Sequence, residues 1–282
     1  MFGDVFGNGK PVLLCCSGGY AGYAEPDSKH PDEKWTFHRI SPDMKYHKFT
    51  HGMGYGDVNG DGRTDILMAA GWYEQPASLE GDPVWKFHPY PFAPGTGSSQ
   101  MYAYDVNGDG RPDVITSLNA HGFGLAWYEQ LAEKDANGEI QFKKHIILPA
   151  DGKPDKYGVE FSQLHAVALA DMDGDGLKDI VTGKRFWAHG KNGPDAESNK
   201  PAVLYWFKLV RGKNHTASYI PYKIDDDSGV GTEVVVGDVN GDGLPDIVVG
   251  NKKGTFVHLQ EVKKVSKKEW QAAQPKVIEE NK

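Results

Sequence analysis

Four copies of one nine-residue pattern, Asp-x-Asn/Asp-Gly-Asp-Gly-x-x-Asp, constrain this chain more than any other feature. They cover residues 57–65, 105–113, 171–179 and 238–246. Oxygen-bearing side chains at positions 1, 3, 5 and 9 of a tight loop can converge on Ca²⁺, which takes about six to eight oxygen ligands. Glycine at positions 4 and 6 lets the chain curl without a Cβ clash. A surface turn would explain one copy, but four copies with the same acid at position 9 predict calcium-binding loops.

We therefore expect about four structural Ca²⁺ ions, each held by one loop. The predicted ligands are the oxygen-bearing residues of the four copies: Asp57, Asn59, Asp61, Asp65, Asp105, Asn107, Asp109, Asp113, Asp171, Asp173, Asp175, Asp179, Asp238, Asn240, Asp242 and Asp246.

The residues after each copy exclude a helical calcium loop. An EF-hand needs a bidentate Glu at position 12 and a helix on each side. Position 12 is instead Met, Thr, Thr and Val in the four copies. After position 9 the chain continues as β-branched runs such as Ile180-Val-Thr and Ile247-Val-Val, which are typical of strands. Each loop therefore joins two strands.

A longer repeat surrounds the loops. A degenerate copy at residues 4–12 opens the chain, without oxygen ligands at Phe6 and Val12, and successive copies start 48 to 67 residues apart. An aromatic strand and a fourth strand follow within each period. Four short strands repeated around an axis form the blade of a β-propeller. We predict an all-β β-propeller of four-stranded antiparallel blades with calcium-binding A-B loops, of which five blades can be counted.

Domain limits and charge follow from the repeats. The propeller is expected over residues 1–262, with a polar tail over 263–282. Either a ring of five blades closes by itself, or N-terminal blades are missing. Open blade edges would then invite association with another chain. The formal charge of −8 is concentrated in the loops, and four Ca²⁺ ions would neutralise it. No basic stripe points to nucleic acid, and no membrane span is expected.

The loop motif and its four-strand unit resemble the FG-GAP/VCBS repeat family of calcium-loop propellers. The resemblance implies the fold and calcium. Because loops of this kind are usually filled where calcium is millimolar, we expect an extracytoplasmic protein whose export segment is absent from this chain. It does not imply one activity, because the repeat serves adhesion, sugar binding and catalysis. Residues 71–76, 165–173 and 183–189 are similar to FG-GAP proteins of planctomycete type and, distantly, to the propeller domain of aldos-2-ulose dehydratase. That similarity implies metal-assisted elimination of water from keto-sugars, although no cupin domain follows.

Candidate site residues are those that break the repeat register on the face opposite the loops. Residues repeated in register, such as His38, His88 and His145, are expected to pack within blades. Residues that break the register should instead meet at the mouth of the central channel. The predicted catalytic residues are His51, His121, His165, Lys184 and Arg185, and the predicted ligand contacts are Trp72, Trp187, Asn251 and Lys252.

Two classes of function remain open for this channel mouth. Three imidazoles can hold a transition metal or act as acid and base, while Lys and Arg would stabilise developing negative charge. The first class is therefore a site for a small carbohydrate-like ligand or glycan, with a possible transition metal and possible dehydratase or lyase activity. The alternative is a non-catalytic adhesion or scaffold module that binds another protein or glycan around a purely structural channel.

Overall fold

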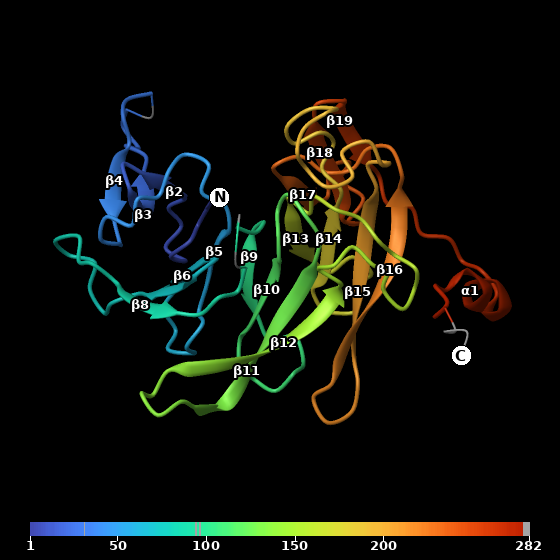
Figure 1. Cartoon of the computed structure of the whole chain (residues 1–282), viewed down its shortest axis with the longest axis horizontal. Helices are drawn as coiled ribbons and strands as arrows, with labels where there is room; N and C mark the ends of the chain where they lie inside the picture. The colour runs from blue at the N-terminus through green and yellow to red at the C-terminus, as the bar shows by residue number, and fades with distance from the viewer. Residues whose placement is uncertain (31, 94, 96, 279–282) are drawn as a thin grey trace. The chain divides into compact units, whose positions relative to one another are not determined.

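The computed structural model describes residues 1–30, 32–93, 95 and 97–278 and has an all-β fold (Figure 1). Strands make up 39% and helix 3% of the described residues, which confirms the predicted class. The chain forms two compact units. The first comprises Met1–Thr116 and Trp127–His145, and the second comprises Ser117–Ala126 and Ile146–Lys282. Residues 94 and 96, in the long connection 89–100 that is expected on the face opposite the loops, lie outside the described residues. The last four residues of the predicted tail do so as well.

The first unit contains a four-stranded sheet and most of an eight-stranded sheet (Figure 1). The four-stranded sheet runs in chain order: β1 (Phe2–Gly3), β2 (Val12–Ser17), β3 (Tyr20–Glu25) and β4 (Thr36–Arg39). The eight-stranded sheet has the order β12-β11-β10-β9-β5-β6-β7-β8. Its strands are β5 (Met53–Gly56), β6 (Asp65–Met68), β7 (Gly71–Glu74), β8 (Lys86–Pro89), β9 (Met101–Tyr104), β10 (Asp113–Ser117), β11 (Leu125–Lys134) and β12 (Ile140–Leu148).

The eight-stranded sheet departs from the expectation of separate blades. It consists of two antiparallel four-stranded repeats whose first strands, β5 and β9, pair in parallel through Gly54–Met101 and Tyr55–Tyr102. The reason is local, because a Cβ on Gly54 would lie 1.8 Å from the carbonyl oxygen of Met101. Glycine at this position therefore lets the two strands approach to hydrogen-bonding distance.

The second unit contains two further sheets, which pack around one apolar core (Figure 1). Val181 and Leu204 from the first sheet meet Val234 and Ile247 from the second in this core. The first sheet comprises β13 (Val167–Ala170), β14 (Asp179–Gly183), β15 (Leu204–Arg211) and β16 (Ala217–Asp225). The second comprises β17 (Val234–Gly237), β18 (Asp246–Asn251) and β19 (Gly254–His258).

The segment expected to be a polar tail contains a short helix, α1 (Lys267–Ala273). Ser266 begins it with a capping box, in which Ser266 and Glu269 satisfy each other's backbone N–H groups. No residue of α1 is buried. Two hydrogen bonds nevertheless join this segment to the rest of the second unit. The Tyr222 hydroxyl donates to Gln274 Oε1 at 2.6 Å, and the Ile278 amide donates to the Lys156 carbonyl at 2.8 Å.

Aromatic and histidine side chains that recur in register stack on each other within the sheets. The ring centroids are 4.8 Å apart for Tyr23 and His38, 4.0 Å for Trp72 and His88, and 4.2 Å for Trp127 and His145. In each pair one residue lies on the third strand and the other on the fourth strand of one repeat. The prediction that these in-register histidines pack within the repeats is therefore confirmed.

The aspartate at position 9 of each loop is fully buried and joins two segments of backbone. One oxygen of Asp113 accepts the amide of Val106, at loop position 2, at 2.9 Å, and the other accepts the amide of Gln130, on the third strand, at 2.8 Å. Asp65, Asp179 and Asp246 make the same two kinds of hydrogen bond. Each carboxylate thus fastens its loop to the third strand of its repeat.

We expect Asp113→Ala to lower the free energy of unfolding by about 2 to 4 kcal/mol, because it leaves two buried amides without acceptors. Urea unfolding with excess chelator measures this without any contribution from metal. Asp226→Ala, at an exposed position, should change stability by less than about 0.5 kcal/mol. Equal stability of Asp113→Ala and wild type would contradict the role of Asp113 in joining its loop to the third strand.

Candidate functional site

The candidate site lies in the second unit, where Gln163 joins three connecting segments. Its backbone amide donates to the Gly122 carbonyl at 2.6 Å, and its carbonyl accepts the Arg185 amide at 3.0 Å. Its side chain donates to the Ala196 carbonyl at 3.0 Å and accepts the Ala188 amide at 3.4 Å. Gln163 is fully buried and has a left-handed backbone with φ of 59°. These bonds bring the segments that follow β10 and β14 to the segment that precedes β13.

Two histidines contact one aspartate at this junction, and a third histidine packs against one of them. The His121 and His165 ring centroids lie 5.1 Å apart, and those of His121 and His189 lie 4.8 Å apart. Asp195 Oδ1 is 3.1 Å from His121 Nδ1 and 2.9 Å from His189 Nδ1. The structure thus places two of the predicted histidines together and adds His189 and Asp195, which the register argument did not single out.

Burial and hydrogen bonding set the charge of these groups. Burial lowers the pKa of His121, although the Asp195 carboxylate opposes that shift. Burial alone would raise the pKa of Asp195, but the hydrogen bonds from His189 outweigh it and hold that pKa below its usual range. At neutral pH the site therefore combines an ionised carboxylate with a neutral His121 imidazole.

Lys184 and Arg185 add cationic side chains next to this cluster. Lys184 is only 1% exposed, and its ammonium donates to Ser162 Oγ at 3.1 Å. Burial lowers the pKa of Lys184 to about 8. Burial also lowers the pKa of Arg185, against the field of Asp195. Both predicted residues are therefore in the site, Lys184 beneath its surface and Arg185 beside Asp195.

The segment after Arg185 is held by a lysine from the turn between β18 and β19. The rings of Phe186 and Trp187 stack with centroids 4.4 Å apart, and Trp187 has a left-handed backbone with φ of 51°. Lys252 Nζ donates to the carbonyls of Trp187 and Ala188 at 2.6 and 2.9 Å. The predicted ligand contacts Trp187 and Lys252 therefore do lie together, but the Lys252 ammonium is hydrogen-bonded to backbone carbonyls. Asn251 likewise donates to backbone carbonyls, those of residues 228 and 230.

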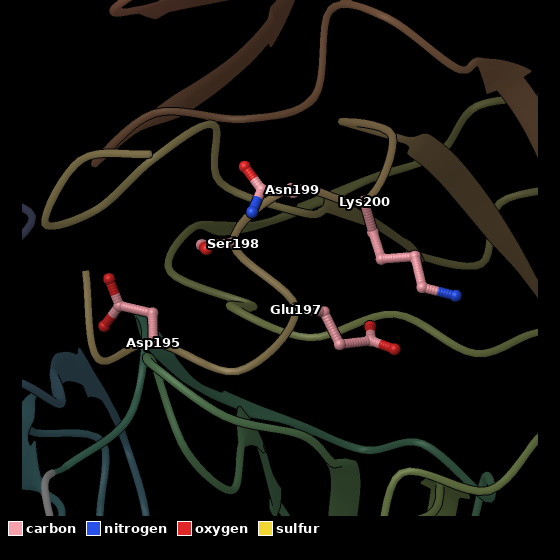
Figure 2. A pocket seen from close by; sticks show the side chains of 5 residues that line it. All are labelled: Asp195, Glu197, Ser198, Asn199 and Lys200. Atoms are coloured by element: carbon pink, nitrogen blue, oxygen red, sulfur yellow. The ribbon is translucent and has the colours of Figure 1, made fainter. Parts of the chain in front are cut away.

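A cavity of about 410 Å³ opens beside Asp195 (Figure 2). Its wall is the 195–200 segment, and in Figure 2 the side chains of Glu197 and Lys200 extend away from the Asp195 carboxylate. Burial raises the pKa of Glu197, and the neighbouring Glu160 raises it further. The lining residues are Asp195, Glu197, Ser198, Asn199 and Lys200.

Two predicted site residues belong to the first unit. Trp72 is 2% exposed and its ring face is covered by His88, so the prediction that it forms a platform for a sugar does not fit its burial. It was singled out as a channel residue because it stands just after the second strand, but its indole packs within the sheet. His51 lies in the segment before β5 and is partly buried. Its participation in the histidine cluster stays a prediction.

The four loops share one conformation. The position 1 carboxylate curls each loop by accepting amides from positions 4, 5 and 6, as Asp57 does from Gly60, Asp61 and Gly62 at 2.7 to 3.0 Å. The other three copies repeat these bonds. A carboxylate has lone pairs left after such bonds, so the loop is shaped around oxygen atoms that can still face a cation.

The loop at 171–179 fits a divalent cation most clearly. Carboxylate oxygens of Asp171, Asp173 and Asp179 lie within 4.8 Å of one another, a spacing compatible with a shared ion. The ammonium of Lys208, on β15, contacts both Asp173 and Asp175. The donor set is hard oxygen throughout, which is the chemistry that calcium prefers. Lys208 is an internal cation that competes for the same carboxylates.

Comparison with protein families identifies the repeats. Residues 57–116 match the FG-GAP-like repeat, and residues 230–259 match the FG-GAP repeat. The chain carries FG-GAP repeats. Three of the four loops fall in these segments, so the family features are the same strand-loop-strand units seen in the structure. Curated proteins gave no match to the chain. The similarity to the propeller domain of aldos-2-ulose dehydratase therefore stays a prediction.

FG-GAP repeats indicate a β-propeller-type domain, and they typically occur in extracellular or periplasmic proteins. Among the described residues, no helix is both long and apolar enough to cross a membrane. The number of blades and the calcium content remain predictions.

The buried Lys184 gives the site a pH signature. Its folded pKa of about 8 lies below the ordinary value of 10.5, so between these pH values the unfolded chain binds more protons. Its contribution to the free energy of unfolding therefore rises with pH over that range, by up to about 3 kcal/mol. We expect wild type to gain stability relative to Lys184→Met between about pH 8 and pH 10, as measured by urea unfolding. Lys191→Met, at an exposed position, is the control, and parallel pH profiles for wild type and Lys184→Met would contradict the shift.

Proposed function

We propose that this protein is a calcium-stabilised β-propeller-type protein of an extracytoplasmic compartment that binds or acts on a sugar-like ligand at the His121–Lys184 site of its second unit. The observation that carries the proposal is the junction at Gln163. It brings imidazoles, a carboxylate and two cationic side chains together from three separate connections, beside a cavity of about 410 Å³. Such convergence of polar groups at a cavity is the usual mark of a ligand site.

The chemistry of the site suits an oxygen-rich, partly anionic ligand. Arg185 can donate two parallel hydrogen bonds to a carboxylate or an enolate, and Lys184 supplies a second positive field from below. His121 and His165 are candidates to remove a proton next to a carbonyl and to protonate a departing hydroxyl. This division of labour supports elimination of water from a keto-sugar or a sugar acid. A site that only binds such ligands would use the same contacts.

Ligand binding can be measured by calorimetry with a panel of keto-sugars and uronic acids. We expect Arg185→Met to weaken binding of a carboxylated sugar by about tenfold or more, because a charged hydrogen bond contributes about 1.5 to 3 kcal/mol. His165→Asn should lower turnover, if turnover occurs, more than it lowers affinity. Lys213→Met, which removes an exposed cation from the β15–β16 turn, is the control and should bind like wild type. Unchanged binding by both site variants would rule out this location.

Calcium is the second part of the proposal. Removing it leaves three or four carboxylates in each loop, and like charges at that range repel. Ca²⁺ that binds only the folded state stabilises it by about 2.7 kcal/mol per site at one hundred times its Kd. The four loops would therefore raise the melting temperature together, each by an amount set by the ratio of the free calcium concentration to its own Kd.

We expect the melting temperature to fall clearly when chelator replaces millimolar calcium. Asp238→Asn should reduce this calcium-dependent shift, because it removes a charged ligand from one loop. Asp4→Asn is the matched control, since the 4–12 loop lacks ligand oxygens at Phe6 and Val12. Melting temperatures that do not respond to calcium in wild type would exclude the calcium assignment.

A second candidate function is an adhesion or scaffold module, and one observation favours it. Val235 and Val257 are 58% and 50% exposed, and both are paired across the sheet with Val248 of β18. An exposed apolar row on a three-stranded sheet is a candidate surface for another protein. Intact partner binding with no response to any sugar in the calorimetric panel would favour this function over the first.

A further inference from the structure

We propose that His121, His189 and Asp195 form a binding site for one divalent transition-metal ion of the Zn²⁺ class. The site is distinct from the oxygen-only calcium loops. It goes beyond the proposed ligand binding and does not rest on it, because metal binding can occur whether or not a sugar is recognised.

The spacing of the donor atoms supports the proposal. Ligands on a tetrahedral ion with bonds of about 2.0 to 2.1 Å lie about 3.3 Å apart. Asp195 Oδ1 lies 3.1 Å from His121 Nδ1 and 2.9 Å from His189 Nδ1. One ligand atom from each of the three residues falls within 4.8 Å of the other two. Small side-chain movements would therefore place all three around one ion.

The donor set has the softness and the openness that such an ion needs. Two imidazoles and one carboxylate form the ligand set of many catalytic zinc sites and of non-haem iron sites, in which further positions stay open to water or substrate. The side chain of Asp195 is 3% exposed whereas that of His189 is 55% exposed. The site thus has a buried anion and an accessible edge, and Asp195 also lines the cavity in which another oxygen ligand could reach the ion.

The backbone holds this ligand set in place. The His189 amide donates to Asp195 Oδ2 at 2.9 Å, which closes the 189–195 segment on itself. Lys252 binds the carbonyls of the two residues before His189, and Ser162 Oγ donates at 2.7 Å to the carbonyl of Ala196, directly after Asp195. Anchors on both sides reduce the entropy that a metal would otherwise have to overcome to order the loop.

A simple hydrogen-bonded pair elsewhere in the chain provides a comparison. His30 Nδ1 lies 3.2 Å from Asp27 Oδ2, on an exposed turn with no second imidazole. An ordinary His–Asp contact needs only that arrangement. At Asp195 two imidazoles address one carboxylate oxygen with their rings stacked, which places three metal-binding groups at one point.

The test uses the full chain, stripped with chelator and then returned to excess Ca²⁺ so that the calcium loops are filled. Titration with Co²⁺ should give visible absorption typical of a low-coordinate site, at one equivalent, and Zn²⁺ should displace it. His189→Ala and Asp195→Asn should each lower the Zn²⁺ affinity by about a hundredfold or more, since even residues behind the ligands cost about 10- to 100-fold. His30→Ala should leave the affinity unchanged.

His189→Ala is the decisive variant, because the side chain is exposed and its loss should leave the melting temperature in Ca²⁺ unaltered. Equal Zn²⁺ affinity in wild type and His189→Ala would overturn the proposal, as would the absence of Co²⁺ binding in wild type. Loss of Zn²⁺ binding in His189→Ala with sugar binding retained would show that the metal site is separate from the proposed ligand site. Zn²⁺ binding by wild type without any sugar binding would refute only the proposed ligand binding.

Discussion

The repeats depend on one interaction, the buried carboxylate at position 9 that accepts two backbone amides. Each amide comes from a different segment, one from the loop and one from the third strand. Burying a carboxyl group here, ionised or protonated, costs desolvation free energy, and the two hydrogen bonds offset that cost. These two hydrogen bonds fix where the loop starts and ends relative to the third strand. Bound calcium would add stability to the same loop.

The candidate site depends in the same way on Gln163. All four hydrogen-bonding groups of Gln163 are bonded, one to Gly122 after β10 and three to the segment between β14 and β15. Its left-handed backbone is a conformation that non-glycine residues adopt at a cost. A residue in such a conformation persists only when its surroundings hold it there. Here the holding contacts are those that bring His121, Arg185 and the 188–196 segment together. Local strain and the convergence of the site are thus two aspects of one arrangement.

The sequence predicted the parts of this structure that repeat. The loops, the strands that flank them and the stacking of His88 on Trp72 all recur at fixed offsets, so each copy supports the others. It also predicted that His121, His165, Lys184 and Arg185 belong together, because they break the repeat register at strand ends that converge on the mouth of the channel. Features that occur once had no such support. Parallel pairing at Gly54 and the Gln163 junction arise from tertiary contacts that occur once and leave no periodic trace. Helix α1 begins at a local capping box, which occurs once and so lies outside the repeat pattern.

The missed residues His189 and Asp195 illustrate the same limit. Both lie in an insertion, where repeat arithmetic has no register to compare, and their proximity to His121 comes from the Gln163 and Ser162 bonds to Ala196. A local clue was present, since a His and an Asp six residues apart on a glycine-containing loop can face each other. Trp72 shows the opposite error. Its place next to a strand end predicted a position at the channel mouth, but its side chain is buried and stacks on His88.

The hydrogen bonds from Lys252 to the Trp187 and Ala188 carbonyls couple two parts of the second unit. Lys252 lies in the turn between β18 and β19, so the site loop and the last hairpin share a mechanical connection. Coupling between two binding sites is reciprocal, so two ligands change each other's binding free energy by an equal amount. Occupation of the site would therefore slow amide hydrogen exchange in the β18–β19 hairpin, and a partner seated on that hairpin would tighten the site without touching it.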